Sequence, residues 1–154
     1  LHELKYLKVR GTLVDSSATN ALANMTALER LDLSETQVGD AGLAGLSKLT
    51  NIQDLNLWAT QVTDAGLIHL TSLINLTRLN LDQTLVGDAG LMQVGKLSTL
   101  KNLILRSTQI TDDGIEHLLT LTNLETLNVE FCTNLGDTGK MLIQEKLPNL
   151  LLTQ

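Results

Sequence analysis

The stretch Ile52–Asn75, IQDLNLWATQVTDAGLIHLTSLIN, is one copy of a unit that recurs along almost the whole chain. The same pattern starts every 24 residues, at Leu4, Leu28, Ile52, Leu76, Leu100 and Leu124. A fixed period of this length indicates a repeat architecture, because one such unit cannot bury its apolar side alone. Each unit is therefore expected to stack on its neighbours and to share one continuous core with them.

Two apolar periods lie within each unit. Leu55 and Leu57 stand two residues apart, which is typical of a short strand with one buried face. Leu67, Leu70 and Leu73 stand three residues apart, which is typical of a short helix with one buried stripe. Each unit is therefore predicted to form a strand, a turn and a helix.

The shared pattern LxxLxLxxTxVxDxGLxxLxxL resembles that of leucine-rich-repeat proteins, and the match covers about residues 4–150. Its segment TxVTDxGL resembles a subtype found in F-box adaptor proteins and in bacterial, notably planctomycete, repeat proteins. Phe131–Gly139 resembles the cysteine-containing variant of that subtype. The resemblance implies an α/β fold, a right-handed solenoid with a parallel β-sheet on the concave side and short helices on the convex side. It also implies that the chain binds other proteins.

We expect residues 1–154 to form a single leucine-rich-repeat domain of six units and a partial strand from Leu150. The last unit departs from the period, because one residue is inserted near Thr133 and another shift precedes Pro148. This reading makes Leu150 the first position of a seventh strand. It leaves Leu151 and Leu152 exposed at an edge that could pair with another chain.

Composition narrows the classes of function. The formal net charge of −6 argues against a nucleic-acid partner. No run of 18 apolar residues occurs, so no membrane span is expected. The one cysteine allows no internal disulfide. Extracellular leucine-rich-repeat proteins often carry cysteine-rich caps, and the resemblance without such caps favours a reducing compartment such as the cytoplasm.

Two polar columns recur at fixed positions of the unit. Position 9 holds a threonine in four units, predicted to bond the turn after the strand and to help satisfy the neighbouring unit's turn: Thr36, Thr60, Thr84 and Thr108. Cys132 holds the same position in the sixth unit. Position 13 holds an aspartate, predicted to cap the helix that it begins: Asp40, Asp64, Asp88, Asp112 and Asp137. A cation-binding acidic ridge is the alternative for the aspartates, but the ligand pattern of a calcium loop is missing.

No catalytic residues, cofactor or metal site are predicted. His69 and His117 share a column on the convex side, where we expect them to be solvated. Two histidines that are two units apart are too distant to share a metal ion. Cys132 has no histidine or cysteine partner at catalytic or metal-binding spacing, so we expect a small buried side chain there.

The candidate binding surface is the concave face. Strand positions 2, 3, 5, 7 and 8 should face it or its rim, because positions 4 and 6 point into the core. All three aromatic residues of the chain occupy such positions, as binding surfaces favour. The candidate partner-binding residues are Tyr6, Asn56, Trp58, Asn80, Ile104, Arg106 and Phe131.

Seven of the eleven basic residues also lie at these positions, but acidic residues alternate with them in the stacked columns. Lys5 should face Glu29, Lys8 should face Asp32, and Lys101 should face Glu125. At position 3 of successive units the order is Arg30, Asp54, Arg78. At position 7 it is Asp82, Arg106, Glu130. These charges are predicted to pair largely with one another, so the face should not form a basic groove.

The sequence thus predicts a non-enzymatic scaffold that binds a protein partner on its concave face. One alternative is a structural segment that self-associates through its open ends. Another is the substrate-recognition arm of a larger regulatory or ubiquitin-ligase-like assembly. The chain does not identify the partner, which is expected to be neither a nucleic acid nor a membrane.

Overall fold

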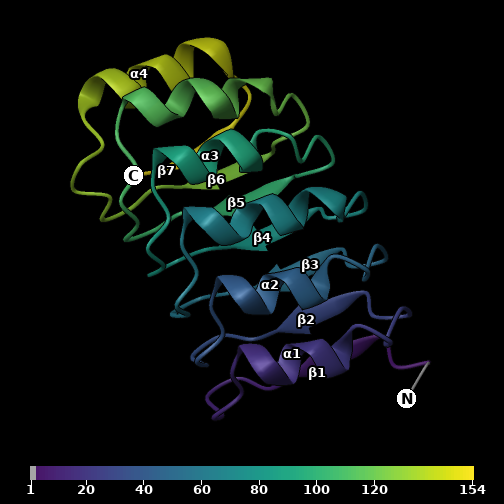
Figure 1. Ribbon diagram of the computed structural model, residues 1–154. Coiled ribbons are helices and arrows are strands. Elements are labelled where there is room, and N and C mark those ends of the chain that lie inside the picture. Colours follow the sequence, from purple (N-terminus) through teal and green to yellow (C-terminus); the bar gives the residue numbers. More distant parts are fainter. Residues whose placement is uncertain (1–2) are drawn as a thin grey trace.

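The computed structural model describes residues 3–154, and within them seven short strands form one parallel sheet in the order β1 to β7 (Figure 1). The strands are β1 Tyr6–Lys8, β2 Arg30–Asp32, β3 Asp54–Asn56, β4 Arg78–Asn80, β5 Asn102–Ile104, β6 Thr126–Asn128 and β7 Leu151–Thr153. The α-helices are α1 Ser16–Leu22, α2 Asp40–Leu46, α3 Asp88–Val94 and α4 Asp137–Lys146, and two helices are of the 3₁₀ type, η1 Asp64–Ser72 and η2 Asp113–Thr120.

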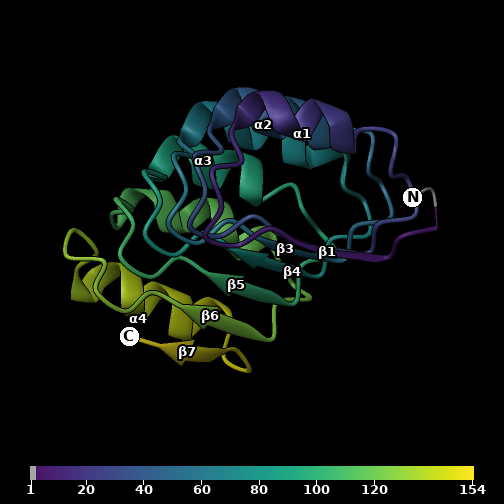
Figure 2. The same ribbon diagram turned by 90° about the horizontal axis from the view of Figure 1, so that it is seen from below.

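The units stack into a curved solenoid. In Figure 2 the helices follow the outer side of the curve and the strands follow the inner side, which confirms a concave sheet and a convex helical face. From β1 to β6 every strand pairs with the residues 24 positions later, as in Leu31 with Leu55 and Leu55 with Leu79. The sequence period is therefore the register of the sheet.

The core is an aliphatic column that the stacked units share. The apolar positions of the third unit, among them Ile52, Leu55, Leu57 and Val62, are fully buried. Each such side chain contributes about 1.5–3 kcal/mol relative to an exposed one. The matching residues of the first unit, such as Leu4 and Leu7, are only partly buried against this core.

The seventh strand differs from its prediction. Its register to β6 is 25 residues, and Leu152 pairs with Leu127. Leu150 would have to follow Leu124 by 26 residues to hold the first position, so that prediction was wrong and Leu150 holds the second position. Leu152 therefore stands in a core column and is half-buried against the core, so the prediction of an exposed Leu152 was wrong. Leu151 is exposed, as expected, and faces the concave side.

The turn after each strand contains one residue in the left-handed region of backbone conformation, always at position 8 of the unit. The residues and φ angles are Gly11 68°, Glu35 55°, Ala59 52°, Gln83 52°, Ser107 54° and Phe131 59°. Only the first unit uses glycine, the residue that adopts this conformation without steric cost. Stacking of the units therefore imposes a turn that local sequence preference does not favour.

The threonines of position 9 close the turn within their own unit. Thr60 Oγ1, for example, donates to the carbonyl oxygen of Leu57 at 2.6 Å. The bond to the turn backbone is confirmed, whereas the predicted bond to the neighbouring unit is wrong for Thr36, Thr60 and Thr84. Cys132 is the residue of this column that reaches across, because its Sγ lies 2.9 Å from the carbonyl oxygen of Leu105.

Four aspartates of position 13 bond the following unit instead of capping their own helices, namely Asp40, Asp64, Asp88 and Asp112. Asp40 accepts from the backbone N–H of Thr63 at 2.8 Å and from its hydroxyl at 2.7 Å. Asp64 accepts from the N–H of Gly87 at 2.6 Å. Among residues 3–154, no backbone N–H of α2, η1, α3 or η2 donates to the position-13 aspartate of its own unit, so the capping prediction was wrong for these four residues. These carboxylates join neighbouring units on the side away from the sheet.

The glycines of position 15 make room for the same carboxylates. A Cβ atom on Gly90 would lie 2.5 Å from Asp64 Oδ1, and one on Gly66 would lie 2.5 Å from Asp40 Oδ1. No real Cβ contact is that short, so a larger residue at this position would have to displace the aspartate carboxylate of the preceding unit. Aspartate and glycine thus form one recurring joint between units.

Candidate binding surface

The seven candidate residues lie on one side of the sheet. Tyr6, Asn56, Asn80 and Ile104 belong to strands β1, β3, β4 and β5, and Trp58, Arg106 and Phe131 belong to the turns that follow β3, β5 and β6. Tyr6 is 53% exposed and Phe131 is 66% exposed, whereas the other five are half-buried. The surface is therefore a row of half-buried side chains with an exposed aromatic residue near each end.

Trp58 stacks with a cation two units away. The Arg10 guanidinium carbon lies 4.7 Å from the centre of the indole ring. Arg10 reaches past the small, buried Ser34, and its Nε donates to Glu35 at 2.6 Å. This hydrogen bond to Glu35 raises the pKa of Arg10 above its ordinary value. Cation–π stacking of this kind fixes the indole ring on the concave side.

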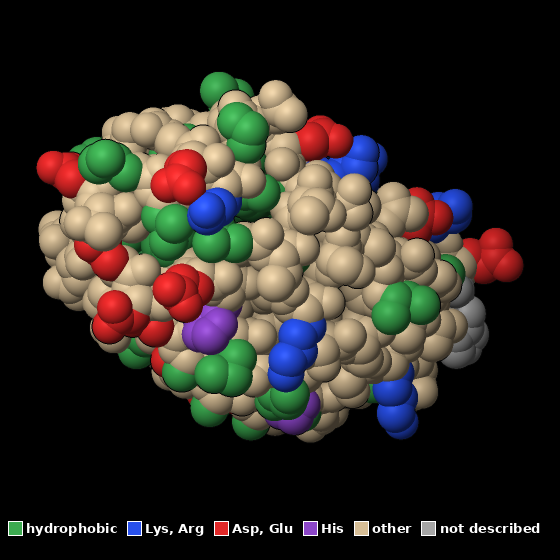
Figure 3. All heavy atoms as spheres, turned by 90° about the horizontal axis from the view of Figure 1, so that it is seen from above, with side chains coloured by type: hydrophobic (Ala, Val, Ile, Leu, Met, Phe, Trp, Pro, Cys, Tyr) green, Lys and Arg blue, Asp and Glu red, His purple; other side chains and the backbone are tan. Residues whose placement is uncertain are grey.

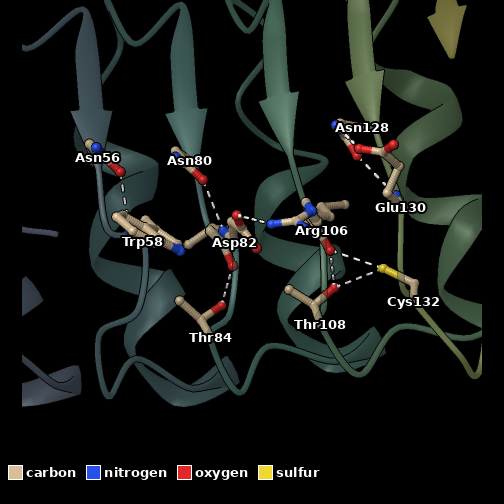
Figure 4. Close-up of polar contacts among 12 residues, drawn as sticks. Asn56, Trp58, Asn80, Asp82, Thr84, Arg106, Thr108, Asn128, Glu130 and Cys132 are labelled. Carbon is tan, nitrogen blue, oxygen red and sulfur yellow. Dashed lines mark hydrogen bonds and ion pairs between the residues drawn. The ribbon is translucent and has the colours of Figure 1, made fainter. Parts of the chain in front are cut away.

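Arg106 joins Asp82 to Phe131. Its Nη1 lies 3.4 Å from Asp82 Oδ2, and its guanidinium carbon lies 4.6 Å from the centre of the Phe131 ring. Figure 4 shows Arg106 turned towards Asp82 along the row of position 7. Because Asp82 is only 9% exposed, it holds Arg106 from a largely desolvated site.

Two polar atoms of this row are buried without a hydrogen-bond partner among residues 3–154, namely Trp58 Nε1 and Asp82 Oδ1. Figure 4 shows the indole lying between Asn56 and Asp82, with its nitrogen on the Asp82 side. One atom is a donor and the other an acceptor. Unsatisfied buried groups are uncommon in folded proteins, so this pair marks the row as unusual.

The side chain at position 5 of a unit supports the turn that carries the side chain at position 7. The Oδ1 of Asn56 accepts from the N–H of Trp58 at 3.1 Å, and that of Asn80 accepts from the N–H of Asp82 at 2.9 Å. The same bond joins Asn128 to Glu130. Sequence reasoning missed this role, although a repeated asparagine or aspartate two residues before a turn position was a usable signal.

Two residues at one corner of the surface differ from the residue types found at the same positions of the other units. Ile104 stands in position 5, where it cannot make the turn bond of Asn56 or Asn80. Phe131 places a bulky side chain at the left-handed position, which costs an L-residue about 1–2 kcal/mol. Departures of this kind gather at functional sites in many proteins.

The charged residues pair largely as predicted. Ion pairs join Lys5 to Glu29 at 2.6 Å, Lys8 to Asp32 at 3.9 Å, Lys101 to Glu125 at 2.8 Å, Arg78 to Asp54 at 3.6 Å and Arg106 to Asp82 at 3.4 Å. Arg10 and Glu35 form a further pair, which the sequence analysis did not include. Exposed pairs of this type contribute little to stability, but they neutralise the face.

The net negative charge lies elsewhere on the molecule. Positions 2, 3, 5, 7 and 8 of the six units hold seven basic and seven acidic residues, so the remainder of the chain carries the whole formal charge of −6. Acidic side chains gather on the left of the face seen in Figure 3, which lies towards the α4 end. The concave face is therefore electrically balanced on a molecule that is otherwise acidic.

The described residues contain no group of three or more His, Cys, Asp or Glu side chains that could hold a metal ion. His69 and His117 are half-buried, not fully solvated as predicted. Cys132 is buried, and its sulfur contacts the Leu105 carbonyl oxygen and the Thr108 hydroxyl. None of the helices within residues 3–154 is both long enough and apolar enough to span a membrane.

The comparisons with known proteins agree with this architecture. A family model described as a leucine-rich repeat matches residues 24–47, 96–119 and 120–143. Among solved structures, the chain is similar to internalin C2 of Listeria monocytogenes, with a TM-score of 0.67 and 22% identity over 96% of this chain and 69% of that one. It is also similar to the internalin inlF of Listeria monocytogenes, with a TM-score of 0.57 and 20% identity over 99% of this chain and 54% of that one.

No curated protein matches the sequence of the chain. The two internalins share its fold at low identity, and the chain spans just over half the length of the second. The three family matches begin at multiples of 24 residues from one another, which is also the register of the sheet from β1 to β6. Sequence period, strand register and structural likeness together show that the chain has the leucine-rich-repeat fold.

Proposed function

We propose that the chain is a non-enzymatic scaffold that recognises a protein partner through its concave face. The observation that carries the proposal is the placement of the aromatic residues. Tyr6, Trp58 and Phe131 are the three aromatic residues of the chain, and all of them lie on this face. Aromatic side chains and arginines are enriched at the centres of protein interfaces, and both kinds stack here in pairs.

The corner formed by Ile104, Arg106 and Phe131 supports the same proposal. Phe131 is exposed and sits in an unfavourable backbone conformation, so it costs stability without filling the core. Ile104 replaces the side chain that would stabilise its own turn. A partner that covers the Phe131 ring would remove its exposed apolar area from water, so this residue would stabilise the complex although it destabilises the free chain.

Recognition would use a surface that is already formed. The strands are held in register by the sheet and by the joints between units, and Trp58 and Phe131 are held by stacked arginines. A preformed surface loses little conformational entropy when it binds. The scaffold would therefore contribute rigid aromatic anchors, and the partner would supply the complementary shape.

A comparison of two variants tests the proposal. Trp58→Ala/Phe131→Ala removes two side chains from the concave face, and Ile68→Ala/Met92→Ala removes two exposed apolar side chains from helices η1 and α3 as a matched control. Each protein is immobilised, after equal thermal stability has been verified, and used to capture proteins from lysate of the source cells. We expect the wild type and the control to retain a protein that the concave variant loses.

Retention of the same proteins by all three forms would show that the concave aromatic residues are not the binding surface. Loss of binding in the control with retention in the concave variant would point to the helical face instead. Either result contradicts concave recognition.

Self-association is a second candidate, and the end of the solenoid favours it. Leu151 on β7 is 65% exposed, and Met141 on α4 is 67% exposed. β7 is also the last strand of the described sheet, so its outer edge is open to a strand of another chain. Sedimentation equilibrium over a hundredfold range of concentration tests this candidate. A mass that stays at 16.7 kDa throughout excludes it.

A further inference from the structure

Two charges of the concave face are left over after its ion pairs are formed. Six of the seven basic residues and six of the seven acidic residues of this face pair with one another. Within residues 3–154, Arg30 and Glu130 are the two concave charges without an ionic partner. They have opposite signs and belong to the second and sixth units.

The leftover charges follow from the alternating columns. In position 3, Asp54 lies between Arg30 and Arg78 and pairs with Arg78. In position 7, Arg106 lies between Asp82 and Glu130 and pairs with Asp82. A column of three alternating charges cannot neutralise itself, so the first has an excess positive charge and the second an excess negative charge. Neighbouring strands place these charges only about 4.8 Å apart, so a shift of the central side chain would not remove the excess.

Each leftover group is available to solvent. Arg30 is exposed and lines a hollow of about 180 Å³ together with Tyr6, whose in-register neighbour it is. Glu130 is half-buried and accepts a hydrogen bond from Asn128 Nδ2 at 3.0 Å. Figure 4 shows Glu130 next to Asn128 while Arg106 extends in the other direction, towards Asp82. Glu130 is therefore separated from the nearest cation of its own column.

The two charges lie at opposite ends of a diagonal across the face. They are four strands apart and four positions apart along the unit, which corresponds to about 23 Å on a flat sheet. A fully extended peptide covers that distance in about seven residues, at about 3.3 Å per residue. The midpoint of the diagonal is position 5 of the fourth unit, which is Asn80.

The centre of the diagonal presents hydrogen-bond donors. Asn56 and Asn80 use Oδ1 for their turn bonds, and neither Nδ2 donates to any group among residues 3–154. A carboxamide Nδ2 donates and cannot accept. Backbone carbonyl oxygens of an extended segment are acceptors of the kind that these two donors would bind.

We infer that the concave face selects an extended protein segment that carries an acidic residue and a basic residue about seven positions apart. The acidic residue pairs with Arg30, the basic residue pairs with Glu130, and carbonyl groups between them accept from Asn56 and Asn80. This inference rests on the proposed function and specifies its partner. It also fixes the direction of the partner, because exchanging its two charges places like charges together at both ends.

The test uses a displayed library of random 12-residue peptides, selected on the wild-type protein. Each enriched peptide is then measured on Arg30→Glu/Glu130→Arg, which reverses both charges and leaves the net charge unchanged. We expect enriched peptides to share the spaced acidic and basic pair and to lose about tenfold in affinity on this variant. A peptide with its two charges exchanged should regain the loss on the variant and bind the wild type poorly.

Two further proteins keep the result interpretable. Arg30→Gln/Glu130→Gln removes both charges without creating repulsion in either column, and it should bind the original and the exchanged peptide equally. Lys48→Glu/Glu116→Lys reverses two exposed charges away from the concave face at constant net charge. It should bind the enriched peptides as the wild type does.

The outcomes separate the inference from the proposed function. Enriched peptides that need Trp58 and Phe131 but ignore both charge variants overturn the inference and leave concave recognition standing. Peptides that bind both Trp58→Ala/Phe131→Ala and Arg30→Glu/Glu130→Arg as tightly as the wild type contradict the proposed function itself. A selection that enriches no peptide with the spaced charge pair also overturns the inference.

Discussion

The carboxylate of Asp88 holds Thr111 of the next unit by two hydrogen bonds, at 2.8 Å from its backbone N–H and 2.7 Å from its hydroxyl. Asp40 holds Thr63 in the same way. The strands join the units on the concave side, and these carboxylates join them on the side of the helices. The repeated aspartate is therefore a connection between units and not a local helix cap.

Replacing Asp88 tests this connection. Asp88→Ala removes a charged acceptor and leaves the N–H of Thr111 without its partner. We expect the free energy of unfolding to fall by about 2 kcal/mol, in line with hydrogen bonds to charged groups. Asp113→Ala is the control, because the Asp113 side chain is exposed and holds no neighbouring unit. Urea denaturation of both variants checks the prediction, and equal losses would contradict it.

The glycine of the joint gives a second test. A Cβ atom on Gly114 would meet the side chain of Asp88. Gly114→Ala alone should therefore cost about 1–3 kcal/mol through overpacking. In the Asp88→Ala background the carboxylate is gone, so the same substitution should cost at least 1 kcal/mol less. Additive losses in this double-mutant cycle would show that the two residues are not coupled.

The left-handed turn position predicts an unusual benefit of glycine. Gln83 is exposed and has a φ angle of 52°. Gln83→Gly relieves an unfavourable conformation at the expense of unfolded-state entropy, so stability should be unchanged or rise by up to about 1 kcal/mol. Ala41→Gly, at an exposed position of helix α2, should instead lose about 0.5–1 kcal/mol. Thermal melts of the pair give the comparison, and a larger loss at position 83 would count against the assigned turn.

Asp15 gives a prediction about pH. Its carboxylate accepts from the Ser17 hydroxyl and from the backbone N–H groups of Ser17 and Ala18, and these bonds lower its pKa below the ordinary value. A carboxyl with a lowered folded-state pKa stabilises the fold above its unfolded pKa, and the contribution is lost as pH falls through the folded value. We expect an NMR titration of Asp15 to give a pKa below that of a model peptide. Ser17→Ala, which removes the hydroxyl, should bring the value back towards it.

Much of the fold was readable from the sequence because one period fixes the register. The spacing of Leu31, Leu55 and Leu79 predicts which residues pair across the sheet, and it also predicts most of the concave ion pairs. The left-handed turn was not predictable from residue types, since Gln83 and Ser107 carry no glycine signal. The conformation there is imposed by stacking, a tertiary effect that overrides local preference.

The candidate surface was readable only in part, for two physical reasons. Contacts that skip a unit leave no trace in the period, as Arg10 does when it passes Ser34 to reach Trp58. Alternating columns also leave the pairing undecided, because Arg106 stands between Asp82 and Glu130 and the sequence favours neither.

The aspartate joints were missed for a different reason. Capping of the adjacent helix already explained why an aspartate recurs at position 13. A threonine at position 12 of the next unit, as at Thr63 and Thr111, was a usable signal that the aspartate bonds that unit.

Trp58 is the single tryptophan of the chain, so its fluorescence reports on the concave face alone. The most direct test of concave recognition is acrylamide quenching of Trp58, with and without a saturating amount of the partner retained by the wild type. Burial of the indole under that partner should lower the quenching constant at least twofold, and the Ile68→Ala/Met92→Ala control should behave as the wild type does. A partner that is bound at saturation yet leaves both the quenching constant and the emission maximum unchanged would contradict recognition through this face.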